Sequence, residues 1–301
     1  MLGLSNERLG ILYASGAYLL WGFLPLYWKL VDHVPAWEIL AHRIIWSFVF
    51  MILLIVTIRR WHLFLEECKQ IMFNKKKLFG ITAAGLIISL NWVIFIWAVN
   101  SDRVLDASLG YYINPLISIF FGFIFLKERF TKIQWTAIAL VFIGVFYMTY
   151  NFGSVPWAAL GMAVTFALYG LLKKTVDLNA IFGLAIETLI VTPVALVYVF
   201  LLESNGTGAM GFSFEGLILI GTGLATALPL LLFGQGAKRI PLSLVGFLQY
   251  FAPTIMLLLG VFLFGESFTQ VHAITFTLIW LGLILYSYER FLHIRKMKTV
   301  G

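Results

Sequence analysis

The chain has 301 residues, of which 61% are hydrophobic and only 12% are charged, about half the charged share of an ordinary soluble domain. Its net charge of +7 is spread over short connections between long apolar runs, which argues against a nucleic-acid partner. The composition therefore excludes a soluble globular protein and predicts one embedded in a lipid bilayer. A single cysteine, Cys68, excludes an internal disulfide, and no Cys or His cluster has ligand spacing, so neither a metal nor another cofactor is expected.

Ten apolar runs of about 20 residues, the length that crosses the hydrocarbon core of a bilayer, follow one another along the chain. The first begins after Arg8 and is too long to be the apolar core of a cleavable signal sequence. The predicted spans are residues 9–30, 37–58, 78–99, 104–126, 133–150, 155–172, 180–202, 217–237, 242–264 and 271–291. Most connections between them are very short, so no soluble domain is expected between the spans.

The connection at residues 59–77 is one of the two longer ones. Its apolar residues recur at helical spacing with charged residues between them, from Trp61 to Met72. This pattern predicts an amphipathic helix at the membrane interface. The preferred interpretation of its role is a solvated linker that has no function beyond anchoring the neighbouring spans.

The Lys and Arg residues predict the orientation of the chain. All but three of the 21 lie before the first span or after an even-numbered span, and the three exceptions are Lys29, Arg43 and Arg103. Because loops rich in Lys and Arg stay in the cytoplasm, both termini are predicted to be cytoplasmic. A miscount by one span would destroy this segregation, so the count and the orientation support each other.

One segment of the chain occurs twice, at an offset of 138 residues without a gap. Its first copy runs from Tyr112 to Thr131 and its second from Tyr250 to Thr269, with Tyr, Pro, Glu, Phe and Thr matched. Matching the fourth span with the ninth also matches the first span with the sixth, where Trp21 and Tyr169 each precede a glycine. The chain is therefore predicted to consist of two homologous halves, residues 1–150 and 151–301, that form one membrane domain.

Each half has five spans, and this odd number forces the second half to enter the membrane in the opposite orientation. The predicted fold is an all-α membrane protein of ten transmembrane helices arranged as two inverted five-helix repeats. The matched glutamates support the inversion, because Glu128 lies between two cations on the predicted cytoplasmic side, whereas Glu266 outside has none beside it. Both glutamates lie at the loop ends of their spans and are predicted to cap helices or fix loops.

At this point the residues resemble a known family. The layout of five plus five spans, the two matched motifs and the pair Trp21 and Gly22 are similar to the EamA family of the drug/metabolite transporter superfamily. The stretches that resemble the RarD-type permeases within it are residues 38–43 (EILAHR), 91–100 (NWVIFIWAVN), 107–116 (ASLGYYINPL) and 248–254 (LQYFAPT). The resemblance implies a multi-pass permease of the bacterial cytoplasmic (inner) membrane, from an exporter-like group associated with chloramphenicol sensitivity or resistance, whose relatives handle amino acids, drugs and metabolites.

Ionisable residues within spans are costly to insert and tend to face protein or a water-filled cavity. Arg43 lies about 10 Å from the start of its span and Glu187 is similarly deep in the matching span of the second half, so an ion pair between them is predicted. Glu38 and His42 lie one turn apart on one helix face. These four residues are candidates for coupling or for structural ion pairing, and the sequence leaves open which role they have.

Polar and aromatic residues near Pro115 and Pro253 predict a central pocket, because proline bends helices where transporters line their sites. Spans 1, 3, 4, 6, 8 and 9 are expected to enclose it. The candidate substrate-binding residues are Trp21, Asn91, Trp92, Tyr111, Tyr112, Tyr169, Gln249 and Tyr250. Tyr111 and Tyr112 point about 100° apart on a helix, so only one is expected to contact a solute fully. For each aromatic residue alone, helix packing is the alternative.

The leading hypothesis for function is a secondary transporter, a probable exporter, that moves small organic solutes by rocking of its two halves. The alternative is a membrane-embedded enzyme or a lipid scramblase-like protein. The sequence contains neither a Gly-rich nucleotide-binding loop nor an HExxH motif, so no enzymatic activity is expected. The expected partners are a small-molecule substrate and the lipid bilayer, and a homodimer is left open.

Overall fold

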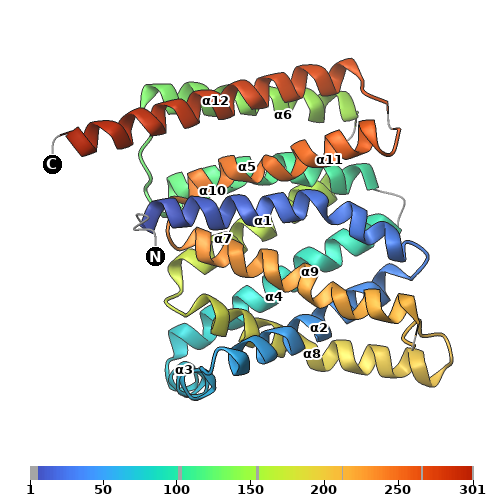
Figure 1. Ribbon diagram of the computed structural model, residues 1–301. Helices are drawn as coiled ribbons and strands as arrows, with labels where there is room; N and C mark the ends of the chain where they lie inside the picture. Colours follow the sequence, from blue (N-terminus) through green and yellow to red (C-terminus); the bar gives the residue numbers. More distant parts are fainter. Residues whose placement is uncertain (1–5, 101–103, 154–155, 212, 266, 300–301) are drawn as a thin grey trace.

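The computed structural model describes residues 6–100, 104–153, 156–211, 213–265 and 267–299, and within these ranges it contains helices and connections but no strand (Figure 1). The helices are α1 (Asn6–Trp28), the short 3-10 turn η1 (Lys29–Val31), α2 (Ala36–Thr57), α3 (Trp61–Phe73), α4 (Lys75–Asn100), α5 (Val104–Phe125), α6 (Lys132–Phe152), α7 (Trp157–Thr175), α8 (Ala180–Ser204), α9 (Phe214–Ala237), α10 (Leu242–Gln249), α11 (Phe251–Phe262) and α12 (Gln270–Thr299). The predicted all-α class is confirmed for the described residues.

In the described ranges, eight helical segments are long and apolar enough to cross a membrane, so the chain is a multi-pass membrane protein. They are Asn6–Val31, Ala36–Thr57, Lys75–Phe95, Lys132–Phe152, Ala180–Ser204, Phe214–Ala237, Leu242–Phe262 and Gln270–Glu289, and Leu109–Phe125 is a shorter apolar helix. The predicted sixth span, α7, is not among them because Lys173 and Lys174 fall in its last turn and lower its mean hydropathy.

The surface of this bundle is apolar in the manner of a protein surrounded by lipid. Large side chains such as Phe146, Phe200 and Ile284 are each at least 60% exposed on long helices. A soluble protein rarely presents so many large apolar side chains to solvent. Hydrocarbon tails solvate them without cost, and the backbone polar groups are satisfied within the helices.

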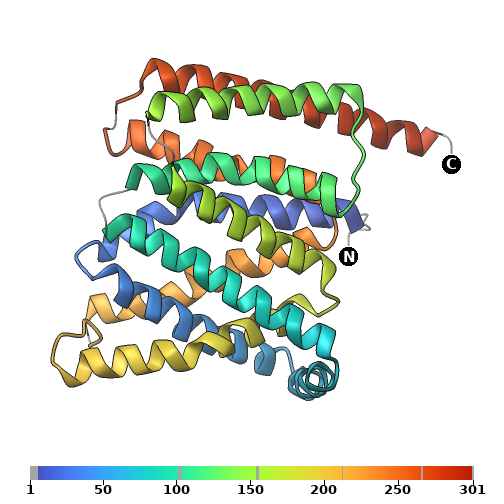
Figure 2. The same ribbon diagram turned by 180° about the vertical axis from the view of Figure 1, so that it is seen from behind.

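The long helices run in roughly one direction across the bundle, and both views show α1 beginning and α12 ending on the same side of it (Figures 1 and 2). The loop between α8 and α9 lies at the opposite side. The predicted helix in the connection at 59–77 is confirmed as α3, which is seen end-on in both views and so crosses the other helices. It buries Phe64 and Ile71 and exposes Trp61, Leu65 and Met72. Whether it lies at a membrane interface stays a prediction.

Helices of the two predicted halves pack on each other throughout the bundle. The main partners of α5 are α7 and α10, those of α2 are α8 and α9, and α6 packs along α12. Helix α1 packs on α9 and on α11, while α4 packs on α7 and α8. The two halves therefore share one core, in which α6 and α12 form an outer layer (Figure 1).

The predicted proline bends differ between the two matched helices. The ninth predicted span is broken at Tyr250, three residues before Pro253, into α10 and α11, whereas α5 continues as one helix through Pro115. Tyr250 Oη donates a hydrogen bond of 3.0 Å to the carbonyl oxygen of Tyr112, in the turn before Pro115. Pro115 lacks the N–H group that would bond the carbonyl oxygen of Tyr111, and the Tyr250 hydroxyl supplies a donor to the neighbouring carbonyl in the same turn.

The capping role predicted for Glu128 is confirmed. Its carboxylate oxygens accept hydrogen bonds from the backbone N–H groups of Leu242 (2.6 Å) and Ser243 (3.0 Å), at the start of α10. The first N–H groups of a helix have no partner within the helix, and a carboxylate there also interacts favourably with the helix dipole. The matching residue, Glu266, lies outside the described residues.

Replacing Glu128 with Ala is expected to lower the free energy of unfolding by about 1–3 kcal/mol, because two backbone donors at the start of α10 lose a charged acceptor. Glu128→Gln should lose less, since its amide oxygen can still accept one of the bonds. Thermal melting of the purified protein in detergent measures both. Equal stability of Glu128→Ala and the parent chain would contradict the capping role.

Candidate functional site

The polar side chain that stands out within the bundle is Arg43, two turns into α2. Its Nε donates a hydrogen bond of 3.0 Å to Thr226 Oγ1 on α9. Its guanidinium carbon lies 4.8 Å from the ring centre of Trp28 on α1 and 5.5 Å from that of Trp92 on α4. Since these partners come from three other helices, the Arg43 side chain points into the bundle and not toward lipid.

Tyr111 of α5 completes the surroundings of Arg43. It is close enough to interact with Arg43 electrostatically, and its side chain is 36% exposed. Within the described part of the chain, no carboxylate lies at ion-pair distance from Arg43. We call Arg43, Trp28, Trp92, Tyr111 and Thr226 the Arg43 site.

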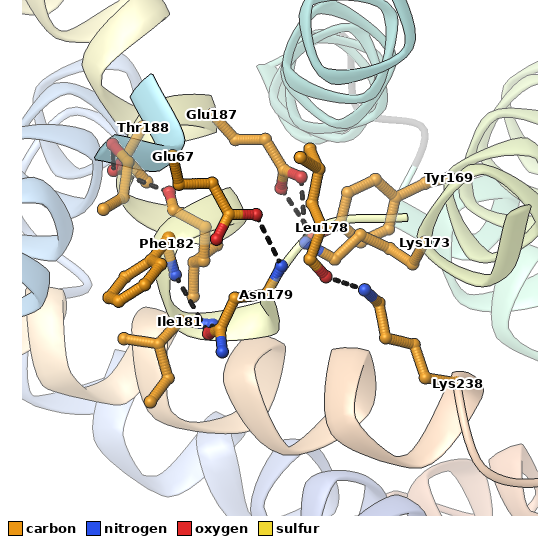
Figure 3. A network of polar contacts seen from close by, with 12 residues as sticks. Glu67, Tyr169, Lys173, Leu178, Asn179, Ile181, Phe182, Glu187, Thr188 and Lys238 are labelled. Carbon is orange, nitrogen blue, oxygen red and sulfur yellow. Dashed lines mark hydrogen bonds and ion pairs between the residues drawn. The ribbon is translucent and has the colours of Figure 1, made fainter. Parts of the chain in front are cut away.

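A second polar cluster lies in the other predicted half, at the same position along the matching helix. Glu187 is the eighth residue of α8, just as Arg43 is the eighth of α2. Glu187 Oε1 lies 2.8 Å from Lys173 Nζ, and Glu187 Oε2 accepts a hydrogen bond of 3.0 Å from Tyr169 Oη (Figure 3). The exposed fractions of Tyr169, Lys173 and Glu187 are 0%, 6% and 3%. This Glu187 cluster is therefore a neutralised, hydrogen-bonded ion pair in the protein interior.

Neighbouring groups attach the loop between α7 and α8 to two further helices. Lys238, at the end of α9, donates to the carbonyl oxygen of Leu178, and Glu67 of α3 accepts a hydrogen bond of 3.0 Å from the backbone N–H of Asn179 (Figure 3). Asn179 itself caps α8, since its side chain accepts from Ile181 N. The amphipathic helix α3 is thereby fixed to the end of the bundle that carries the Glu187 cluster.

The predicted ion pair between Arg43 and Glu187 is wrong. Arg43 contacts Thr226 on α9, whereas Glu187 is paired with Lys173 on α7. Depth along a span says nothing about the direction in which a side chain leaves the helix, and the two side chains turn toward different neighbours. Lys173 was missed because it was counted as a loop cation, although it lies four residues after Tyr169 and so on the same helix face.

Glu38 and His42 do lie on one face of α2, and both are buried. His42 Nε2 is 3.8 Å from Glu38 Oε1, which also accepts a hydrogen bond from the backbone N–H of Ala209 in the loop before α9. The carboxylate thus ties this loop to the start of α2. A role of either residue in coupling stays a prediction.

The eight predicted pocket residues fall into four groups. Trp92 and Tyr111 belong to the Arg43 site. Trp21 and Tyr169 both contact an aromatic cluster between α1, α7 and α9, with their ring centres 5.9 Å and 5.8 Å from that of Phe233. Asn91 links α4 to α7 by donating hydrogen bonds to the carbonyl oxygen of Met162 (2.8 Å) and to Thr165 Oγ1 (2.9 Å).

The remaining three, Tyr112, Gln249 and Tyr250, are buried where α5 meets α10. The Tyr112 ring lies 5.5 Å from that of Phe276 on α12, and Gln249 Oε1 accepts a hydrogen bond of 3.4 Å from Ser118 Oγ. Tyr112 is 8% exposed while Tyr111 is 36% exposed, so the two neighbours do have different surroundings, as the helix geometry predicts. A pocket role of these residues stays a prediction.

Charged residues inside a membrane bundle, as at the Arg43 site and in the Glu187 cluster, are typical of proteins that move solutes or ions across a membrane. Comparison with known proteins identifies the family. The model of the EamA-like transporter family matches residues 8–150 and again residues 154–288. The chain belongs to this family and is a membrane transporter.

Several relatives cover nearly the whole chain. The uncharacterized transporter YojE of Bacillus subtilis (strain 168) is 44% identical over 288 residues, 95% of this chain and 96% of its own. Protein RarD of Escherichia coli (strain K12) is 43% identical over 283 residues, 93% of this chain and 94% of its own. The chloramphenicol-sensitive protein RarD of Pseudomonas aeruginosa is 29% identical over 294 residues, 97% of this chain and 98% of its own.

A crystal structure of a protein that is 20% identical shares the fold, with a TM-score of 0.72 over 92% of this chain and 96% of the other. At this identity the likeness concerns the fold alone. The resemblance to the EamA family and to RarD-type permeases that the sequence motifs indicated is confirmed by the family match and by the relatives named RarD.

Proposed function

We propose that the protein is a secondary transporter that exports small organic solutes by alternating access between two inverted halves of five spans. The observation that carries the proposal is the mirrored packing of the helices. Exchange of the halves maps α1, α2, α4, α5 and α6 onto α7, α8, α9, the pair α10 and α11, and α12. Each main contact between the halves then has a counterpart. The contact of α5 with α7 corresponds to that of α11 with α1, and the contact of α4 with α7 corresponds to that of α9 with α1. The contact of α4 with α8 corresponds to that of α9 with α2.

Mirrored packing matters because it supplies two arrangements of similar energy. If one half adopts the conformation of the other and vice versa, the open side of the bundle changes from one membrane face to the other. The contacts of α2 with α8, α5 with α10 and α6 with α12 pair equivalent helices and would lie along the pseudo-twofold axis. The functional candidates Arg43 and Glu187 occupy equivalent positions near opposite ends of this arrangement.

The substrate is proposed at the level of class: an amino acid, drug or other small metabolite. A relative called chloramphenicol-sensitive makes this antibiotic one member of the panel to be tested. The purified protein would be reconstituted in liposomes loaded with each radiolabelled solute, with and without a pH gradient. Solute efflux faster than that from liposomes without the protein supports the proposal, and dependence of the efflux on the pH gradient identifies proton coupling.

The alternative of a lipid scramblase-like protein is tested in the same liposomes. Fluorescent lipid in the inner leaflet becomes accessible to an impermeant quencher only if the protein moves lipid between leaflets. Lipid movement without efflux of any solute would overturn the transporter proposal in favour of this alternative. A membrane-embedded enzyme would instead convert a solute to a product, which chromatography of the liposome contents detects.

The proposed topology places both termini in the cytoplasm and the loop between α8 and α9 outside. In a Cys68→Ala background, cysteines placed at Asn74 and Asn205 should react with an impermeant maleimide from opposite sides of the membrane. Partial burial and the charge of Glu67 raise the pKa of the Cys68 thiol, so its labelling is slow at neutral pH and becomes faster as the pH rises. Removing Cys68 keeps this pH-dependent background out of the measurement. Labelling of both positions from one side would contradict the ten-span arrangement.

A further inference from the structure

Among the described residues, no carboxylate neutralises the cation of the Arg43 site. A charged side chain within a membrane bundle is costly unless it is paired or faces a polar cavity. The protein neutralises a deeply buried cation, Lys173, with Glu187 at 2.8 Å. The described partners of Arg43 are a hydroxyl at its Nε and two indole rings beside its guanidinium group.

The geometry of the guanidinium group leaves its two Nη nitrogens available. The hydrogen bond to Thr226 uses Nε, and no partner of Nη1 or Nη2 is present among the described residues. Arg43 is half-buried, and neither Nη atom is among the buried side-chain nitrogens that lack a partner in the described part of the chain. The neighbours on α1, α4 and α9 place the guanidinium group between helices of the bundle.

We propose that the Arg43 site binds the oxyanion group, a carboxylate or a phosphate, of a transported solute that also carries a flat apolar body. This inference rests on the proposed transport function and names its substrate class. The planar fork of an arginine matches the two oxygens of an oxyanion in a bidentate pair, which a lysine cannot reproduce. Trp28, Trp92 and Tyr111 offer aromatic surfaces on which the apolar body packs.

The other cations at or within the described helices are engaged differently. Lys174 donates to the carbonyl oxygens of Ala237 and Ile240, and Arg239 donates to Gln235. Lys29 is exposed and lies over the ring of Phe264. Among the described residues, Arg239 also has one donor, Nε, without a partner and lies over the Tyr13 ring, but it stands at the end of α9, whereas Arg43 lies two turns into α2 between two tryptophans. Lys29, at the end of α1 that leads into α2, is a suitable control for the loss of one positive charge.

Equilibrium binding to the full-length protein in detergent micelles tests the proposal without requiring transport. Isothermal titration in a chloride buffer would compare benzoate, phenyl phosphate, benzyl alcohol and benzylamine, which share one ring and differ in the polar group. We expect benzoate or phenyl phosphate to bind at least about 10-fold more tightly than benzyl alcohol, and benzylamine to bind most weakly. Which of the two anions binds more tightly identifies the oxyanion as carboxylate or phosphate.

Arg43→Gln should weaken binding of the preferred anion by about 10- to 100-fold and leave benzyl alcohol unchanged, while Lys29→Gln changes neither. Arg43→Lys keeps the charge but not the planar fork, so its anion affinity should lie between those of the parent chain and Arg43→Gln. It serves as the informative variant if Arg43→Gln does not fold. Equal anion affinity of folded Arg43→Gln or Arg43→Lys and the parent chain, tighter binding of benzylamine, or no binding of any probe would overturn the inference.

The two proposals fail in different ways. Anion binding that depends on Arg43, with no solute efflux from liposomes, would leave the site standing and remove the transport function. Efflux of solutes without any preference for oxyanions, unchanged in Arg43→Gln, would leave the transport function standing and remove the site.

Discussion

Glu187→Gln is expected to lower the free energy of unfolding by about 3–5 kcal/mol, because it leaves the ammonium group of Lys173 buried without a counter-charge. Glutamine keeps one acceptor oxygen, so either Tyr169 Oη or Lys173 Nζ also loses its hydrogen-bond acceptor. Lys173→Met should cost less, since the carboxylate of Glu187 keeps its hydrogen bond from Tyr169. Unfolding of the purified protein by heat or by SDS, followed by circular dichroism, measures these changes.

The double variant Lys173→Met with Glu187→Leu should recover most of the lost stability. Replacing both members of a buried ion pair with apolar residues of similar size is often neutral, since no charge then has to be desolvated. The matched control is Glu187→Gln combined with Arg43→Gln: these side chains are not in contact, so their costs should add. Additive losses in the Lys173 and Glu187 double variant would show that the pair does not interact.

Transport by the double variant separates a structural role of this pair from a functional one. A stable double variant that still moves solute assigns the pair to holding α7 and α8 together. A stable double variant without transport assigns it to the transport cycle, because stability no longer explains the loss. This comparison needs the double variant, since the single variants change stability and charge at once.

The helices of the protein could be predicted from the sequence because hydropathy is a property of whole segments. Twenty apolar residues between charged connections are enough to indicate a span, whatever the side chains contact. The cap formed by Glu128 was likewise predictable, since a carboxylate at the loop end of a span lies near helix ends. The end of α7 was harder to predict, because its last turn carries two lysines that are typical of a loop, although Lys173 is buried against Glu187.

The contacts inside the bundle could not be predicted, because they depend on the rotation of each helix about its axis. Equal depth suggested that Arg43 and Glu187 pair, yet the two side chains turn toward α9 and α7. Trp92 and Tyr111 were found as candidates by residue type, but only the three-dimensional arrangement places them beside Arg43. Trp28 was missed, because a tryptophan at the end of a span is ordinarily read as an interfacial anchor.

Gly223→Ala is expected to destabilise the protein by about 3 kcal/mol and to disrupt the contact between α2 and α9. A Cβ atom at Gly223 would lie closer than 3.0 Å to the backbone of Trp46, and the adjacent hydrogen bond from Ser47 Oγ to the carbonyl oxygen of Gly223 holds the two helices at this separation. Backbone atoms cannot move aside as a flexible side chain can, so the helices must separate.

Two other glycines provide a graded comparison for the same substitution. Gly85 is the corresponding contact of α4 with α8, where a Cβ atom would lie 3.2 Å from the carbonyl oxygen of Glu187, so Gly85→Ala should cost less than Gly223→Ala. At Gly16 the nearest atom is Leu232 Cδ1 at 3.6 Å, an ordinary contact, and the better helix propensity of alanine should make Gly16→Ala neutral or stabilising by up to about 1 kcal/mol. Thermal melting in detergent ranks the three variants.

Since α2 and α9 belong to different halves, Gly223→Ala should also slow transport more than its stability alone explains. An unchanged melting temperature for Gly223→Ala would show that these helices can separate without loss, and that close backbone packing does not join the two halves.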